Sequence, residues 1–182
     1  MEHLEQLGLD PRYVGWLVST TINTGNARIS GVEFNIRHSL RGIGTWGSYF
    51  DVFLNGTKLE LQGSDQAAFT SSIPKSLNWG FTFSRKPVTF VARWNYMGGQ
   101  RGALVSALGP DVYTYNRFPR ATVDVNLDWQ FRKKMTLFAG AKNLEELPRL
   151  QLRYGSNSPA YARQLQVQSF GVIFNVGLKN SF

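Results

Sequence analysis

The clearest pattern in the chain is a strict alternation of apolar and polar residues over positions 121–132. The apolar set is Ala121, Val123, Val125, Leu127, Trp129 and Phe131, and the intervening set is Thr122, Asp124, Asn126, Asp128, Gln130 and Arg132. A period of two residues is that of a β-strand with one apolar face. The pattern therefore predicts a strand at this position.

Seven further segments show the same period with more interruptions. They lie at residues 14–23, 32–36, 50–54, 77–83, 88–96, 137–141 and 170–178. In the last segment one face carries Phe170, Val172, Phe174, Val176 and Leu178, and Ile173 is an exception on the other face. We expect about eight antiparallel strands of about nine to twelve residues, close to the length that a tilted strand needs to cross a bilayer.

The connections between these segments alternate in length. Short connections lie at residues 41–45, 85–87 and 132–134, and long ones lie at residues 55–75, 97–117 and 143–166. Short turns on one side and long loops on the other are typical of up-and-down barrels in outer membranes. The hairpin at residues 23–27 is the exception, because it is short where this scheme expects the outside.

These patterns predict an all-β fold, namely an antiparallel up-and-down transmembrane β-barrel segment of about eight strands. It occupies residues 13–182, and residues 1–12 form an irregular lead-in. The apolar faces are bulky and aromatic, and the opposite faces mix Gly, Asn, Asp, Thr and Arg, which suits a wet lumen. Because periodicity does not say which face is outside, a soluble lipocalin-like ligand binder with the apolar set inside remains an alternative.

The charge balance is 20 Lys+Arg against 12 Asp+Glu, which gives a net charge of +8. Six of the basic residues are placed in the short connections: Arg41, Arg85, Lys86, Arg132, Lys133 and Lys134. They form no compact patch, so we expect no nucleic-acid partner. Cationic turns fit the anionic headgroups of a membrane instead, and we expect outer-membrane lipid and lipopolysaccharide as surroundings.

Residues for catalysis or cofactor binding are not apparent. The chain has no cysteine, and its two histidines, His3 and His38, are far apart in sequence, so neither a thiolate site nor a metal site is expected. Asp124 and Asp128 share a strand face at a spacing of about 13 Å, which is too long for a pair of catalytic carboxylates. We expect a protein that is not an enzyme and that carries no cofactor.

Two glycine-containing motifs have structural interpretations. Residues 98–102 (GGQRG) superficially resemble a phosphate-binding loop but lack the Gly-Lys-Ser/Thr that would complete it, so we expect the root of a long loop. Asn55 and Gly56 belong to a glycosylation sequon, but Asn-Gly is first a turn signal.

Three segments resemble the C-terminal part of a TonB-dependent outer-membrane receptor. Residues 23–33 (NTGNARISGVE) are similar to the family's N-x-G-x-A-x-x-x-G-x-E hairpin, in which Gly25 supplies a positive φ and Gly31 a bulge or a close backbone approach. Residues 137–144 (LFAGAKNL) resemble the penultimate strand. The terminal alternation resembles the signal read by the barrel-assembly machinery, and its residues are Phe170, Val172, Phe174, Val176, Leu178 and Phe182.

The resemblance implies a 22-stranded barrel that is filled by an N-terminal plug and energised by the TonB complex through that plug. The cargo in the family is a scarce ligand such as an iron chelate (siderophore), cobalamin, a nickel complex or an oligosaccharide. Because a 22-stranded wall takes roughly 500 residues, we expect this chain to be a fragment or a truncated relative that lacks the other strands and the plug. It is then not expected to transport alone, and a self-standing eight-stranded barrel is the alternative.

Ligand contacts are expected on the long connections. The candidates are Tyr113, Tyr115, Asn116 and Arg117 in one connection and Arg153, Tyr154 and Tyr161 in the last. Connections positioned by a rigid scaffold commonly carry binding residues. Ordinary loop composition with interfacial aromatic residues is the alternative explanation for this set.

Overall fold

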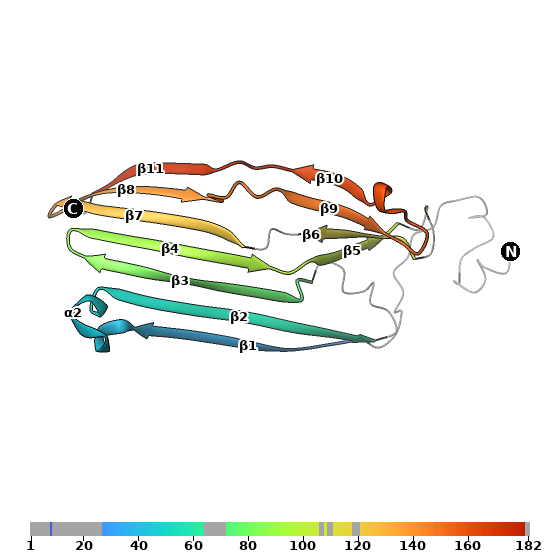
Figure 1. Cartoon of the computed structure of the whole chain (residues 1–182), viewed down its shortest axis with the longest axis horizontal. Helices are drawn as coiled ribbons and strands as arrows, with labels where there is room; N and C mark the ends of the chain where they lie inside the picture. Colours follow the sequence, from blue (N-terminus) through green and yellow to red (C-terminus); the bar gives the residue numbers. More distant parts are fainter. Residues whose placement is uncertain are drawn as a thin grey trace.

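The computed structural model describes residues 8, 27–63, 72–105, 108, 111–117 and 121–180. In this part of the chain the strands form two antiparallel sheets (Figure 1). The first has seven strands in the order β1-β2-β3-β4-β7-β8-β11, and the second has four strands in the order β10-β9-β6-β5. The predicted strand at residues 14–23, Gly25 and Phe182 lie outside the described residues.

The elements have the following bounds. The strands are β1 (Ala27–Ser39), β2 (Phe50–Gly63), β3 (Lys75–Arg85), β4 (Val88–Met97), β5 (Gln100–Leu104), β6 (Tyr113–Arg117), β7 (Thr122–Arg132), β8 (Met135–Lys142), β9 (Arg149–Tyr154), β10 (Gln164–Gln168) and β11 (Ile173–Asn180). The short helices are η2 (Leu40–Gly42), α2 (Gly44–Gly47) and η5 (Ala160–Ala162).

The second sheet prolongs four strands of the first. Along the chain, β4 runs into β5, β6 into β7, β8 into β9 and β10 into β11, and the neighbour order is the same in both sheets. Figure 1 shows the four extensions lying together at one end of the molecule. The described chain is therefore an up-and-down arrangement of long antiparallel strands. The connections at residues 97–117 and 143–166, which the sequence predicted as long loops, contain the strands β5, β6 and β9 and the start of β10, because their backbones pair with each other.

β2 also runs further than its sequence suggests. Asn55 and Gly56 lie inside this strand and not in a turn, so the turn prediction was wrong. A Cβ on Gly56 would lie 2.8 Å from Cζ of Phe34 and 2.9 Å from Cδ1 of Leu77. A glycine is needed at this position because the ring of Phe34 on the neighbouring strand covers it. The backbone of Gly56 does not adopt the positive φ that a turn would require.

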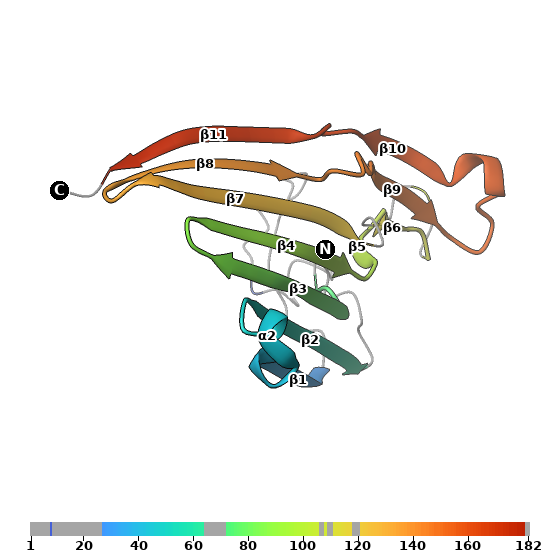
Figure 2. The same ribbon diagram turned by 60° about the vertical axis from the view of Figure 1, so that its left-hand side comes forward.

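All three short connections lie at the same end of the seven-stranded sheet, which we call the short-turn end (Figure 2). Residues 86–87 and 133–134 join β3 to β4 and β7 to β8, as predicted. The connection from β1 to β2 is longer than the predicted 41–45, because η2 and α2 fill it. The opposite end, which carries β5, β6, β9 and β10, is called the far end below.

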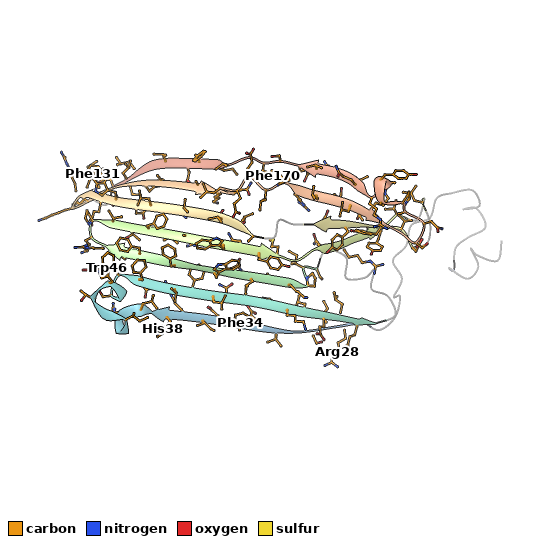
Figure 3. The ribbon with its side chains drawn as sticks, in the orientation of Figure 1. Arg28, Phe34, His38, Trp46, Phe131 and Phe170 are labelled. Atoms are coloured by element: carbon orange, nitrogen blue, oxygen red, sulfur yellow. The ribbon has the colours of Figure 1, made fainter. Side chains whose placement is uncertain are left out.

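The two faces of the large sheet differ in chemistry, because residues paired across strands share a face. The polar face carries Asn35, Asn55, Asn78, Asn95, Asp124, Asn126 and Asn175, as the register shows. The apolar face carries Phe34, Leu54, Trp79, Trp94, Val125, Ala141 and Phe174. Figure 3 shows side chains standing along all of these strands.

The apolar face is exposed and no second layer covers it within the described residues. Phe174 is 73% exposed and Val176 is 72% exposed. The only buried apolar residues in the described part of the chain are Ala92, Val112 and Ala141. The apolar rows therefore do not converge on a dry centre, which is the arrangement that a lipocalin-like barrel requires.

The described sheet is open. Among the described strands, β1 pairs only with β2 and β11 pairs only with β8. The register between β1 and β2 has no shift, and a Cβ on Gly31 would lie 2.6 Å from the backbone oxygen of Lys58. Of the two roles expected for Gly31, the structure thus selects a close backbone approach and not a bulge.

Candidate functional site

Three of the predicted contact residues come together on one face of the small sheet. Tyr113 on β6 is paired directly with Tyr154 on β9, and their ring centroids are 6.0 Å apart in a stacked arrangement. The ring of Tyr115 meets that of Tyr154 edge-on, with centroids 5.7 Å apart. Residues from two different predicted loops are thus brought together by strand pairing.

Two arginines that the sequence did not single out complete this group. The guanidinium carbon of Arg101 lies 4.4 Å from the ring centroid of Tyr113, and that of Arg163 lies 5.5 Å from the ring centroid of Tyr154. Cations over aromatic faces are attracted by the ring quadrupole. We call Arg101, Tyr113, Tyr115, Tyr154 and Arg163 the tyrosine–arginine cluster.

The motif at residues 98–102 contributes to this cluster, and its interpretation as a loop root was wrong from Gln100 onward. Gln100–Leu104 is β5, and its residue Arg101 is paired with Tyr115. A Cβ on Gly99 would lie 2.7 Å from Cε1 of Tyr115. The glycine therefore leaves room for the tyrosine side chain. The sequence alone did not reveal this strand, because whether a segment pairs with another strand depends on residues that are distant along the chain.

The other predicted contact residues lie elsewhere. Arg153 is paired with Thr114, which places it on the opposite face from the tyrosines, and Asn116 shares that face. The side-chain amide of Asn116 donates a hydrogen bond to Oε1 of Gln100 over 3.4 Å. Tyr161 lies in η5 and is 90% exposed. Arg117 ends β6, and its side chain lies outside the described residues.

Arg153 lines a cavity of about 270 Å³ at the far end. Its lining residues are Leu108, Asp111, Val112, Arg153, Asn157, Ser158, Pro159 and Ala162. Nε of Arg153 is buried and has no hydrogen-bond partner among the described residues. A buried donor without a partner is costly, and the described residues supply no acceptor for this nitrogen.

Asp111 ties two connections of the far end together. Its carboxylate accepts a hydrogen bond from the backbone N–H of Ser156. Hydrogen bonds from the hydroxyl and the backbone N–H of Ser156 hold the pKa of the Asp111 carboxyl below its usual value. The contact is therefore formed by the ionised carboxylate.

A row of amides crosses the polar face of the large sheet. Asn35, Asn55, Asn78 and Asn95 are paired in direct sequence across β1, β2, β3 and β4. The side-chain amide of Asn78 donates to Oδ1 of Asn55 over 3.0 Å. Beside this row lies a hollow of about 440 Å³, lined by Asn35, Arg37, Phe53, Asn55, Asn78, Thr82, Arg93 and Asn95. This face can therefore offer hydrogen bonds to water, ligand or protein.

The two aspartates of β7 extend the hydrogen bonding on this face. Asp124 accepts from the amide of Asn95 over 3.2 Å and from the backbone N–H of Asn143 over 3.0 Å. Asp128 forms an ion pair with Nζ of Lys179 on β11 over 3.1 Å. Each aspartate thus links its strand to other segments of the sheet.

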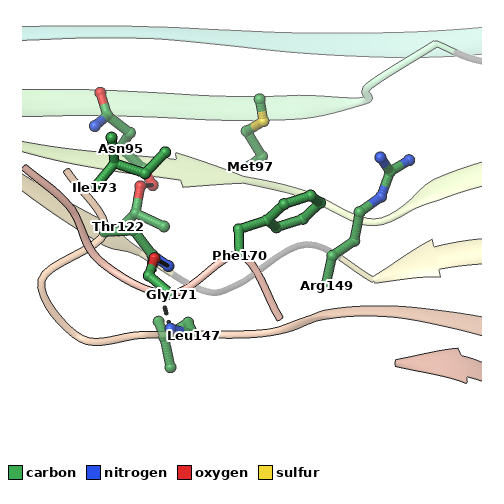
Figure 4. A pocket seen from close by; sticks show the side chains of 9 residues that line it. Asn95, Met97, Thr122, Leu147, Arg149, Phe170, Gly171 and Ile173 are labelled. Carbon is green, nitrogen blue, oxygen red and sulfur yellow. Dashed lines mark hydrogen bonds between the residues drawn. The ribbon is translucent and has the colours of Figure 1, made fainter. Parts of the chain in front are cut away.

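A second hollow, of about 360 Å³, lies on the polar face where the large sheet meets the small one (Figure 4). It is lined by Asn95, Met97, Thr122, Asn143, Leu147, Arg149, Phe170, Gly171 and Ile173. Phe170 was assigned from its alternation to the same face as Phe174, and this assignment was wrong. β11 begins only at Ile173, and the φ of +63° at Gly171 breaks the extended backbone before it.

The other described residues of the predicted assembly signal lie partly inside β11 and partly before it. Phe174, Val176 and Leu178 lie in β11 and are exposed on the apolar face, whereas Val172 precedes the strand. The alternation of the terminal segment therefore describes residues 173–180 correctly and fails before Gly171.

No group of three or more His, Asp or Glu side chains within the described ranges is placed to hold a metal ion. No helix in that part of the chain is long and apolar enough to cross a membrane.

A comparison with protein families gave one match that covers most of the chain. Residues 6–144 match the family described as TonB dependent receptor-like, beta-barrel. Neither the curated proteins nor the solved structures gave a match to this sequence. The matched range includes β1 to β8 and therefore most of the large sheet.

Proposed function

Because the chain belongs to the family of TonB-dependent receptor-like β-barrels, we propose that it forms part of the barrel wall of a receptor in the outer membrane of a Gram-negative bacterium. The family is one of transport receptors and not of enzymes. The apolar face of the large sheet meets lipid, and the polar face lines the lumen. The observation that carries this proposal is that no described layer covers the apolar face, which lies opposite a face of amides and charges.

Completion of the wall needs further strands. In hydrocarbon every backbone N–H and C=O group must be paired, so the open edges of β1 and β11 are not viable in lipid. We propose that other strands of the receptor cover them, and that a plug fills the lumen and couples to the TonB complex. In this proposal the barrel-assembly machinery reads the terminal strand, in which Phe174, Val176 and Leu178 are exposed on the apolar face.

The far end is the proposed place of ligand contact. The tyrosine–arginine cluster offers ring faces and guanidinium groups, which suit a ligand that carries aromatic rings or negative charge. Among the ligand classes of the family, this chemistry favours an iron chelate. The expected contacts are Tyr113, Tyr115, Asn116, Arg117, Arg153, Tyr154 and Tyr161, together with Arg101 and Arg163.

The orientation of the wall is testable because the chain contains no cysteine. Asn175 and Val176 are neighbours on opposite faces of β11, and both are exposed in the structure. In proteoliposomes that hold the complete receptor containing this chain, with any cysteine elsewhere in the receptor replaced, a water-soluble maleimide should label Asn175→Cys rapidly and Val176→Cys only after detergent is added. Equal labelling of the two variants, or preferential labelling of Val176→Cys, would contradict the proposed orientation.

Ligand contact is tested by a matched pair of tyrosine variants. Binding of a ferric catechol chelate to the receptor that contains this chain should weaken at least about fivefold in Tyr154→Leu, as expected for a loss of about 1 kcal/mol. Tyr49→Leu, in the residue before β2 at the short-turn end, should leave binding unchanged. If the receptor binds cobalamin or a malto-oligosaccharide and not the chelate, the proposal that the ligand is an iron chelate is wrong. The proposal that the chain forms part of the barrel wall is unaffected by that result.

A further inference from the structure

A continuous series of aromatic rings runs along the apolar face from the short-turn end. The rings belong to Tyr49, Phe83, Phe50, Phe81, Phe90, Trp94 and Trp79. Successive centroid separations along the series are 6.2, 5.1, 6.0, 5.9, 6.3 and 6.3 Å, with Phe81 contacting both Phe90 and Trp94. We call this series the aromatic band. It lies on β2, β3 and β4 and begins in the residue before β2.

A cavity of about 320 Å³ opens where the aromatic band reaches the short-turn end. It is lined by Thr45, Trp46, Tyr49, Phe83 and Arg85. The guanidinium carbon of Arg85 lies 5.2 Å from the ring centroid of Tyr49. Trp46, labelled in Figure 3, is 77% exposed beside it. The cavity therefore joins a cation, a hydroxyl and three aromatic side chains.

The charge of Arg85 has no carboxylate partner in the part of the chain that the structure describes. The next residue, Lys86, adds a second positive charge. A planar guanidinium binds phosphate oxygens in a bidentate manner. The cavity is thus suited to a singly charged phosphate group such as a phosphodiester.

We propose that this cavity binds the phosphate of a glycerophospholipid, with one acyl chain lying along the aromatic band. The inference rests on the lipid-facing orientation of the apolar face in the proposed function. Tyrosine and tryptophan prefer the level of the headgroups, which is where the cavity places Tyr49 and Trp46. Free phosphate would use Arg85 alone, whereas a phospholipid uses both the cation and the rings that continue from it.

The turn at residues 133–134 supplies a matched control. Arg132 is, like Arg85, the last residue of a strand at the short-turn end, and it is followed by Lys133. It does not line the cavity. If cationic turns attract anionic lipid only through their general charge, Arg85 and Arg132 should be equivalent.

The experiment measures lipid retention by the full chain in detergent, with phosphatidylglycerol and diacylglycerol of the same acyl chains as probes. Native mass spectrometry should show phosphatidylglycerol retained in preference to diacylglycerol. Arg85→Gln should lower that retention about fivefold, whereas Arg132→Gln should leave it within about twofold. Arg85→Lys keeps the positive charge but loses the bidentate guanidinium, so it should retain an amount of phosphatidylglycerol between those of the unaltered chain and Arg85→Gln. This variant replaces Arg85→Gln in the comparison if the glutamine variant fails to fold.

Several results would overturn the inference. These are an equal loss of phosphatidylglycerol in Arg85→Gln and Arg132→Gln, equal retention of the two lipids by the unaltered chain, or displacement of phosphatidylglycerol by millimolar inorganic phosphate. The maleimide labelling of Asn175→Cys and Val176→Cys separates this failure from that of the proposed function. Correct labelling without selective lipid retention removes the lipid site and leaves the wall assignment in place.

Discussion

The ring of Phe138 on β8 lies over Gly177 on β11, its direct partner in the sheet register. A Cβ on Gly177 would lie 2.6 Å from Cε1 of Phe138, which leaves no room for a side chain. The same relationship joins Phe53 to Gly80 and Phe34 to Gly56 on other strand pairs. A ring that covers a glycine on the next strand shields its backbone and fixes the register of the two strands.

The first prediction concerns this contact. Gly177→Ala should destabilise the sheet by about 1–3 kcal/mol, because the methyl group forces the Phe138 ring away from its present position. The matched control is Gly42→Ala, since no atom lies within 4 Å of the Cβ that it adds. Urea unfolding in detergent, followed by tryptophan fluorescence, measures both changes. A loss in Gly42→Ala as large as in Gly177→Ala would refute the explanation.

Asn143 gives a second prediction. Its backbone has a positive φ of 56°, its side-chain amide donates to the oxygen of Gly171 over 3.0 Å, and its Oδ1 accepts from the N–H of Leu147 over 3.3 Å. Asn143→Ala loses both hydrogen bonds and strains the backbone, so stability should fall by about 1–3 kcal/mol.

Asn143→Gly separates these two causes. It relieves the strain and removes only the hydrogen bonds, so its loss of stability should be smaller than that of the alanine variant. The same unfolding measurement compares the two variants. A glycine variant less stable than the alanine variant would show that the backbone conformation is not the reason for this asparagine.

A third prediction follows from Asp111. Its pKa is lowered in the folded chain, so the contact with Ser156 contributes above the usual carboxyl pKa of about 3.9 and is lost as pH falls through the lower folded value. Hydrogen exchange at the N–H of Ser156, corrected for the intrinsic rate, should increase in that acid range. Asp111→Asn should show little of this pH dependence, and an unchanged dependence in that variant would assign it to another group.

The open edges give a fourth prediction. Folded in detergent without other receptor strands, the chain should associate through β1 and β11, because both edges present unpaired backbone groups. Analytical ultracentrifugation should therefore detect oligomers. A compact monomer whose gel migration changes on heating would instead support the alternative of a self-standing barrel.

The sequence predicted the regular parts of the sheet well where the pattern was local. Residues 121–132 were expected to form a strand, and β7 is Thr122–Arg132. The turns at residues 85–87 and 132–134 were also expected, and the strands on both sides end beside them. These features depend on side-chain alternation over a few residues, which requires no knowledge of the neighbouring strand.

Strand pairing decided what the sequence alone could not. Tyr113 and Tyr154 meet because β6 and β9 pair in one register, and Arg101 joins them because residues 100–104 form β5 and not a loop. Asn55 looked like a turn residue and instead belongs to the amide row of the polar face.

The chain by itself thus determined the period of its strands, their two chemically distinct faces and its family. The tertiary structure decided how far the strands extend beyond the expected turns, which side chains meet across them, and that no described layer covers the apolar face. The physical reason is that alternation is a property of neighbouring residues, whereas register is set by hydrogen bonds between segments that are distant in sequence.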